Sequence, residues 1–266
     1  QTCALPILLA IVARQQQHQG LEAEALASAD RALELAHATS VWSLVNRLVA
    51  PIFLDQRLLE RAELALRQAL LAEPQRPELH LQLAETLLLQ QQLLEGFQEY
   101  EWRPNQWRAS QGCQSQWIPS KHQQEPLVLV AEGTLGDTLL FSRYGPWLKR
   151  QHGLDVRLSV QLPLLKLLQQ ALGDTLPVEP ANPRRSLPEG SSGRVLSLPS
   201  APAVFGTCQE HPALASPHLK ADPQTVDEWR QRLNLAHGEH LLGLNWHGLP
   251  LRLPTLTERH PSDIPL

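Results

Sequence analysis

Residues 60–74 read ERAELALRQALLAEP, and this stretch gives the clearest indication of how the first half of the chain folds. Ala62, Leu66 and Ala69 recur at the three- and four-residue spacing of one helix face, which predicts an amphipathic helix with one buried side. The alanines on that side are small enough to let a second helix approach closely. Pro74 then ends the helix, because a proline nitrogen has no hydrogen to donate.

The same pattern recurs on both sides of this stretch. It returns after Pro77 at His80, Leu83, Ala84, Leu87, Gly96 and Tyr100, and an earlier copy reads Leu9, Val12, Ala13, Gly20, Ala25, Ala29 and Ala32. A middle copy begins near Trp42 and Val45 and carries a short insertion before Ala62. Residues 1–104 therefore resemble about three tetratricopeptide repeats, whose unit is about 34 residues. Such arrays hold a peptide or protein partner on their concave face.

Residues 105–125 form a polar connector in which the helical periodicity is lost. Trp107 and Trp117 lie within it, and each ring is a large apolar surface that is costly to expose to water. We expect both rings to pack across the junction between two domains.

The second half alternates short apolar runs with helical patterns. Strands are expected at 126–131, 155–160, 195–198 and 241–246, helices at 139–150, 163–171 and 225–233, and an exposed Pro/Ser/Gly-rich loop at 179–193. Asp227 and Glu228 are expected in the first turn of the last helix, which Pro223 opens. This alternation predicts a Rossmann-like parallel α/β sheet, with 241–246 as its last strand.

The loop EGTLGDT, residues 132–138, lies between the first strand and the first helix of this domain. Ligands of open α/β sheets bind outside the carboxyl ends of the strands, so the loop is a candidate binding site. Gly133 and Gly136 permit backbone conformations that other residues avoid. A P-loop would require a lysine here and a dinucleotide fingerprint a third glycine, so the sequence fits neither.

Several motifs around this loop resemble glycosyltransferase family 9, the heptosyltransferase-like group, and more closely the bacterial tetratricopeptide proteins that carry such a domain at the C-terminus. In chain order they are Tyr100-Glu-Trp-Arg103, Trp117, Glu132 with Leu135-Gly-Asp137, Phe141 with Arg143-Tyr144, Leu196-Ser-Leu-Pro199, Trp229 and Gly243-Leu-Asn-Trp-His-Gly248. The resemblance extends over the whole chain, and the ordered set is more specific than any one motif. In one respect the chain departs from the family, which usually has Gln-Gly where Gly133-Thr134 stand.

The resemblance implies a sugar transfer from a nucleotide-sugar donor to an acceptor, with no further cofactor and no metal. It gives Asp137 the role of general base, which takes the proton of the attacking acceptor hydroxyl. Residues implied to bind substrate are Glu132, Gly133, Thr134, Gly136, Arg143 and His247. It also implies the GT-B arrangement, in which 126–240 is the Rossmann-like acceptor-side half. The donor would be held mainly by a second half, of which 241–266 would be the first strand and lead-in.

Each of these roles has a structural alternative. Asp is among the best N-cap residues, so Asp137 is equally well explained as the cap of a helix. Arg143 is more simply read as a surface residue than as a phosphate ligand, and His247 as a capping or exposed histidine. The pair His237 and His240 precedes a strand and lacks the helical spacing of a zinc protease motif.

Composition excludes several other classes. A net charge of -4 gives no basic excess for holding nucleic acid. The apolar stretch of residues 4–13 is far shorter than the roughly 20 residues that span a bilayer, and no signal peptide is recognisable. Three separated cysteines indicate a reducing, cytoplasmic environment and no disulfide framework.

Two functions remain as hypotheses. The first is the N-terminal part of a tetratricopeptide glycosyltransferase; since Leu266 comes just where the donor half should begin, we expect this chain to be a fragment that turns over nothing by itself. The second is a non-catalytic scaffold, in which the repeats bind a protein partner and the α/β domain is degenerate.

Overall fold

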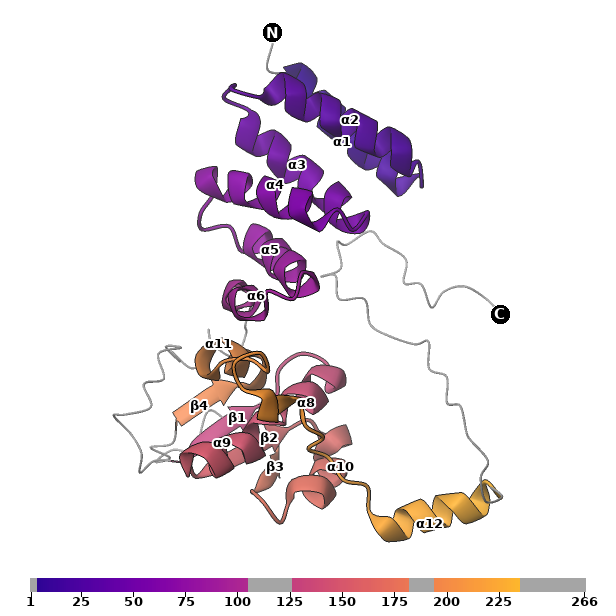
Figure 1. Cartoon of the computed structure of the whole chain (residues 1–266), viewed down its shortest axis with the longest axis vertical. Coiled ribbons are helices and arrows are strands. Elements are labelled where there is room, and N and C mark those ends of the chain that lie inside the picture. Colours follow the sequence, from indigo (N-terminus) through magenta and orange to yellow (C-terminus); the bar gives the residue numbers. More distant parts are fainter. Residues whose placement is uncertain (1–3, 105–125, 182–193, 235–266) are drawn as a thin grey trace. The chain divides into compact units, whose positions relative to one another are not determined.

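The computed structural model describes residues 4–104, 126–181 and 194–234 (Figure 1). The chain divides into two units, residues 1–220 and 221–266. The first contains a helical array followed by a parallel four-stranded α/β region, as the sequence predicts. The strand expected at 241–246 and the tryptophans of the 105–125 connector lie outside the described residues.

The array consists of three helical hairpins that follow one another along the chain (Figure 1). Their helices are α1 (Ala4–His18), α2 (Glu22–Ala36), α3 (Trp42–Asp55), α4 (Leu59–Ala72), α5 (Pro77–Leu89) and α6 (Leu93–Tyr100). The two helices of each hairpin pack against each other, and α3 and α5 also contact the hairpin that precedes them. Leu66, Ala69 and Leu83, which the sequence assigns to the core, are buried.

The same turn joins the two helices of every hairpin. One residue in each turn is left-handed, namely Gly20, Arg57 and Gln91, with φ of 77°, 58° and 64°. The amide of the following residue then bonds back to the carbonyl of the residue four positions before the left-handed one, at 2.8–2.9 Å in all three turns. This is the bond that closes a Schellman motif. Successive turns are 37 and 34 residues apart. Adding these offsets to the number of a residue in one hairpin gives the equivalent residue in the next hairpin.

Small residues occupy matching positions throughout the array. Ala13, Ala50 and Ala84 form one set and Ala25, Ala62 and Gly96 a second, and the five alanines and one glycine are all buried. A Cβ atom on Gly96 would lie 2.9 Å from the Leu88 side chain, closer than real Cβ contacts allow. Gly96 is therefore the direct counterpart of Ala25 and Ala62, at the point where the helices of a hairpin cross.

The α/β region carries a sheet of order β3-β2-β1-β4, with every neighbouring pair parallel. Its strands are β1 (Leu127–Val130), β2 (Val156–Val160), β3 (Val178–Pro180) and β4 (Arg194–Ser197). Its helices are α8 (Leu135–Phe141), α9 (Tyr144–His152), α10 (Leu162–Leu172) and α11 (Ala201–Phe205), with short 3-10 turns at Leu198–Ser200 and Pro212–Ala215. Alternating β1, β2 and β4 residues form the core together with Trp147 and Leu148 of α9.

Three local expectations are corrected by the structure. The helix expected at 139–150 is two helices, α8 and α9, because Pro146 has no N–H for the Ser142 carbonyl and fits only in the first turn of a new helix. The loop expected from residue 179 begins later, since Glu179 and Pro180 pair with β2 as part of β3. Helix α12 (Pro223–Arg232) starts before Thr225, so Asp227 and Glu228 lie beyond its first turn, and its N-cap is Asp222.

Candidate active site at the carboxyl edge of the sheet

The sheet reverses its direction of growth between β1 and β4. From β1 the chain adds β2 and then β3 on one side, and β4 returns to the other side of β1. The crevice outside the carboxyl ends of such a strand pair is where open α/β sheets bind ligands. Glu132 follows β1 at this point, and Ser197 ends β4 beside it, with its hydroxyl donating to Glu132 Oε2.

Arg103, which follows α6, lies at this edge of the sheet. Its Nε and Nη2 donate to the two carboxylate oxygens of Glu132 at 2.9 and 3.2 Å, and Nη2 also donates to Ser200 Oγ at 2.7 Å. Nη1 donates to Glu101 Oε1 at 2.6 Å and to the Tyr100 carbonyl at 3.2 Å. The Arg103 side chain is only 7% exposed. Glu132 is one of the residues implied to bind substrate, and in the structure its carboxylate is held by a guanidinium of the same chain.

Sequence reasoning missed this pairing, although the repeat register contains a signal for it. Arg103 occupies the position of Ala32 and Ala69, which are fully buried in the first two hairpins. A buried guanidinium needs hydrogen-bond acceptors, and the apolar surroundings of the equivalent alanines in a hairpin do not provide them. Helix α6 ends at Tyr100, after 8 residues where α2 has 15 and α4 has 14, so Arg103 lies beyond the helix and meets Glu132.

Asp137 lies in the third position of α8 and forms a capping box with Thr134, the N-cap residue. The Thr134 amide and hydroxyl donate to Asp137 Oδ2 at 2.7 and 2.8 Å, and the Asp137 amide donates to Thr134 Oγ1 at 3.1 Å. The alternative that Asp137 itself is the N-cap is thus corrected: Thr134 is the cap and Asp137 its reciprocal partner. Within the described residues, every hydrogen bond that the carboxylate accepts ends on Oδ2.

The two glycines of the loop differ in what they contribute. Gly133 has φ of 81°, and a Cβ atom there would lie 2.6 Å from Asp137 Oδ2. This position therefore requires glycine both for its backbone and for the approach of the Asp137 carboxylate. Gly136 has an ordinary helical conformation in α8, with only Thr134 Oγ1 near its missing Cβ, so its expected conformational freedom is not used.

A second polar contact ties the loop to the end of β2. Gln161, which follows β2, accepts a hydrogen bond from Thr138 Oγ1 at 2.8 Å. Its side-chain amide donates to the Gly133 carbonyl at 3.5 Å. Gln161, at the carboxyl end of β2, thus connects to both ends of the loop that carries Asp137, through Gly133 and Thr138.

Arg143 is directed away from this loop. Its guanidinium donates to the backbone carbonyls of Leu140 at 2.8 Å and Leu214 at 2.7 Å, and so holds residues 212–218 against the junction of α8 and α9. Ser142, buried at that junction, contacts His218 Nε2 at 2.9 Å. Burial, and secondarily the charge of Arg143, lowers the pKa of His218. The substrate-binding role that the resemblance implies for Arg143 stays a prediction.

The pairing of Thr134 with Asp137 is not unique within the described part of the chain. Thr207 donates through its amide and hydroxyl to Glu210 at 2.6 and 2.7 Å. Thr225 does the same to Asp222 at 2.8 and 2.7 Å. The Thr207 hydroxyl lowers the pKa of Glu210, and the Thr225 hydroxyl that of Asp222. The same arrangement therefore serves local structure at two positions outside the crevice.

Other expected site residues cannot be located. His247, with His237 and His240, lies outside the described residues. Among the residues that are described, no three His, Cys, Asp or Glu side chains group as metal ligands. None of the described helices is both long enough and apolar enough to cross a bilayer.

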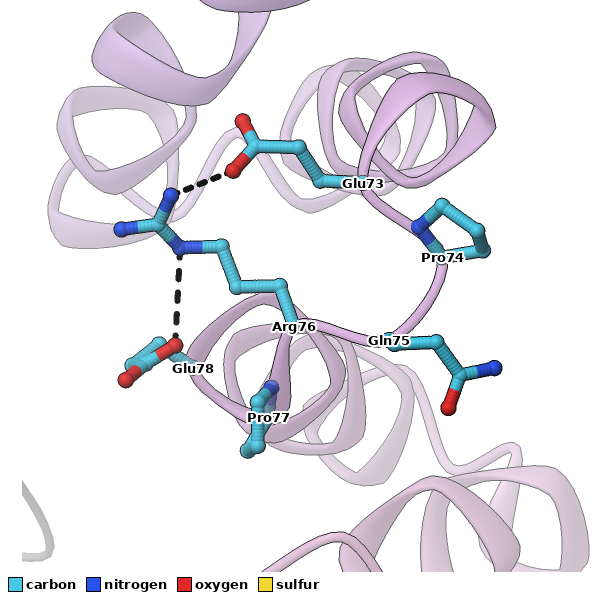
Figure 2. Close-up of a pocket in the computed structure, with 6 residues that line it drawn as sticks. All are labelled: Glu73, Pro74, Gln75, Arg76, Pro77 and Glu78. Carbon is cyan, nitrogen blue, oxygen red and sulfur yellow. Dashed lines mark hydrogen bonds and ion pairs between the residues drawn. The ribbon is translucent and has the colours of Figure 1, made fainter.

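A pocket lies on the surface of the α4–α5 turn, well separated in sequence from the sheet. Figure 2 shows Arg76 between Glu73, to which it donates a hydrogen bond, and Glu78, with which it forms an ion pair at 3.5 Å. All of its lining residues, Glu73 to Glu78, come from one continuous turn. Arg47 of α3 also forms an ion pair with Glu73 at 3.2 Å. These charged groups are used in holding the turn, so the pocket does not compete with the carboxyl edge as a candidate site.

Comparison with protein-family models, with curated protein sequences and with solved structures found no match. The fold therefore rests on the structure itself, and the family resemblance of the sequence motifs remains a prediction.

Proposed function

We propose that this chain is the tetratricopeptide and acceptor-side part of a glycosyltransferase that transfers a sugar from a nucleotide-sugar donor. The hairpin register, with its recurrent turn and its buried alanines, supports the tetratricopeptide assignment. The parallel sheet, with a loop-bearing β1 next to the switch point, supports the assignment of the second region.

The position of Asp137 is the observation that carries this proposal. Thr134 fixes one carboxylate oxygen, Oδ2, with two hydrogen bonds, and the loop places the group at the carboxyl end of β1. The second oxygen, Oδ1, is the atom that would accept the proton of an acceptor hydroxyl as its oxygen attacks the anomeric carbon. The bond from that carbon to the nucleotide phosphate would then break, and the nucleotide would leave with the bonding pair. A base must be held in this way to act within hydrogen-bond distance.

The test is the substitution Asp137→Asn in the complete enzyme that the resemblance implies, with sugar transfer as the readout. Asparagine can keep the capping contacts with Thr134 but cannot take a proton, so turnover should fall by about 10²-fold or more. Asp222→Asn is the matched control, because Asp222 has the same two contacts with a threonine and no place in the crevice. Unchanged turnover in Asp137→Asn would remove Asp137 from the mechanism.

A non-catalytic scaffold is the second candidate, and Arg103 is the observation that favours it. The guanidinium bonds to side chains that follow β1 and β4, and the two contacts from a threonine amide and hydroxyl to a carboxylate recur where no chemistry is expected. On this hypothesis the repeats bind a peptide or protein, and the α/β region stabilises the end of the array. Calorimetry with nucleotide-sugars on the complete protein separates the two, since a scaffold gives no heat of binding.

A further inference from the structure

Helix α1 carries an apolar face that is open to solvent. Leu8 and Val12 on this face are 57% and 45% exposed, and Leu5 and Ile11 beside them are similarly exposed. In the register set by the recurrent turn, Leu8 corresponds to Val45 and Leu79, and Val12 to Val49 and Leu83. Those four counterparts on α3 and α5 are at most 2% exposed. This face is thus buried in the second and third hairpins and exposed in the first.

The difference must come from outside the hairpin itself. All three hairpins share the turn and the small residues at the helix crossing, so the second helix of a hairpin does not account for the burial of Val45 and Val49. Among the described residues, a hairpin precedes α3, and α3 contacts both of its helices, α1 and α2. No described hairpin precedes α1. The α1 face therefore continues an interface that already exists between successive hairpins.

The established interface also indicates the chemistry of a fitting partner. The fully buried residues of α2 are Ala25, Ala29, Ala32 and Ala36, and α4 likewise buries three alanines. A small-residue helix allows the large residues of the next hairpin to pack closely. A second copy of this chain cannot offer its last hairpin in the same way, because α6 contacts α11 and Phe97 packs edge-on against Phe141, with ring centroids 5.8 Å apart.

We propose that the exposed face of α1, formed by Leu5, Leu8, Ile11 and Val12, docks a helical hairpin of the same repeat type, with an alanine-rich second helix and a free following face. Docking buries Leu8 and Val12 as Val45 and Val49 are buried in α3. The array described here thus accepts further hairpins at α1, and at α6 it is closed by the α/β region.

The experiment extends the full chain with a copy of one of its own hairpins. A copy of residues 4–41 is joined directly to Leu5, so that the original α1 takes the register of α3. Hydrogen exchange of the original α1 amides should slow by roughly tenfold or more, since the helix no longer ends the array. The pair Leu8→Gln and Val12→Gln in the original α1 should abolish this protection. The same pair in the unextended chain should leave its melting temperature unchanged.

Leu64→Gln with Leu71→Gln is the control, because both α4 leucines are more exposed than Leu8 and neither lies at a stacking position. This variant of the extended chain should keep the full protection. Unaltered exchange in the extended chain, or protection that persists with both glutamines in α1, would overturn the proposal. So would sedimentation showing that the unextended chain dimerises and that Leu8→Gln with Val12→Gln makes it monomeric, since the occupant would then be a second copy.

Discussion

Replacing Arg103 by alanine should cost more stability than any surface charge removal in this protein. The guanidinium is 7% exposed and gives two hydrogen bonds to Glu132, whose side chain is 20% exposed. Without Arg103 the Glu132 carboxylate keeps the Ser197 hydroxyl but loses the two hydrogen bonds from the guanidinium. Removing one partner of a buried pair costs about 3–5 kcal/mol. For a unit of this size, each kcal/mol shifts the melting temperature by roughly 2–4 °C, so we expect a fall of roughly 6–20 °C.

A double-mutant cycle separates the pair from other losses. Arg103→Ala, Glu132→Gln and the double variant are unfolded in urea and followed by circular dichroism. Because the two side chains bond directly, the double variant should be more stable than the sum of the single losses indicates, by about 0.5–3 kcal/mol. Since the pair joins the end of α6 to the carboxyl edge of the sheet, we also expect the parent to unfold in one transition and Arg103→Ala in two.

The control is Arg157→Ala, which removes an ion pair of the same chemistry on the surface. Arg157 and Glu179 lie 3.4 Å apart on β2 and β3, and their side chains are 44% and 57% exposed. Such a pair is worth about 0–1 kcal/mol. Equal losses in Arg103→Ala and Arg157→Ala, or strict additivity in the cycle, would refute the reasoning that Arg103 and Glu132 form a buried, coupled pair.

Two further predictions concern the loop and the contact at the α8–α9 junction. Gly133→Ala should destabilise the protein more than Gly153→Ala, measured by thermal unfolding: both residues are left-handed, which costs alanine about 1–2 kcal/mol, but only at Gly133 must Asp137 also move. Similar losses at the two positions would contradict the close contact with Oδ2. Because the pKa of His218 is lowered on folding, the unfolded chain binds the proton more readily, and the stability that neutral His218 contributes above about pH 6.5 is lost as the pH falls below that value. His218→Gln should reduce the fall in melting temperature between pH 8 and pH 5.5. His18→Gln, at an exposed position, should leave that fall unchanged.

The sequence by itself determined the features that depend on neighbours along the chain. The spacing of Ala62, Leu66 and Ala69 defines a buried helix face whatever the rest of the molecule does, and the structure confirms it. The apolar run ending at Val130, followed by a glycine loop, likewise identified β1 and the candidate edge of the sheet. Errors at this level were local as well: one helix was expected in place of α8 and α9, and Asp137 was considered as an N-cap where Thr134 is the cap.

Only the tertiary structure decided which distant groups meet. Arg103 and Glu132 are 29 residues apart, and Arg103 and Ser200 are 97 apart, so no local pattern relates them. The resemblance of the local motifs implied a substrate-binding role for Glu132, whereas the guanidinium that its carboxylate contacts comes from the end of the helical array. The physical reason is that helix and strand patterns arise from hydrogen bonds and burial over a few neighbouring residues. The partner of a buried charge depends instead on how distant elements pack together, and the sequence pattern does not give that packing.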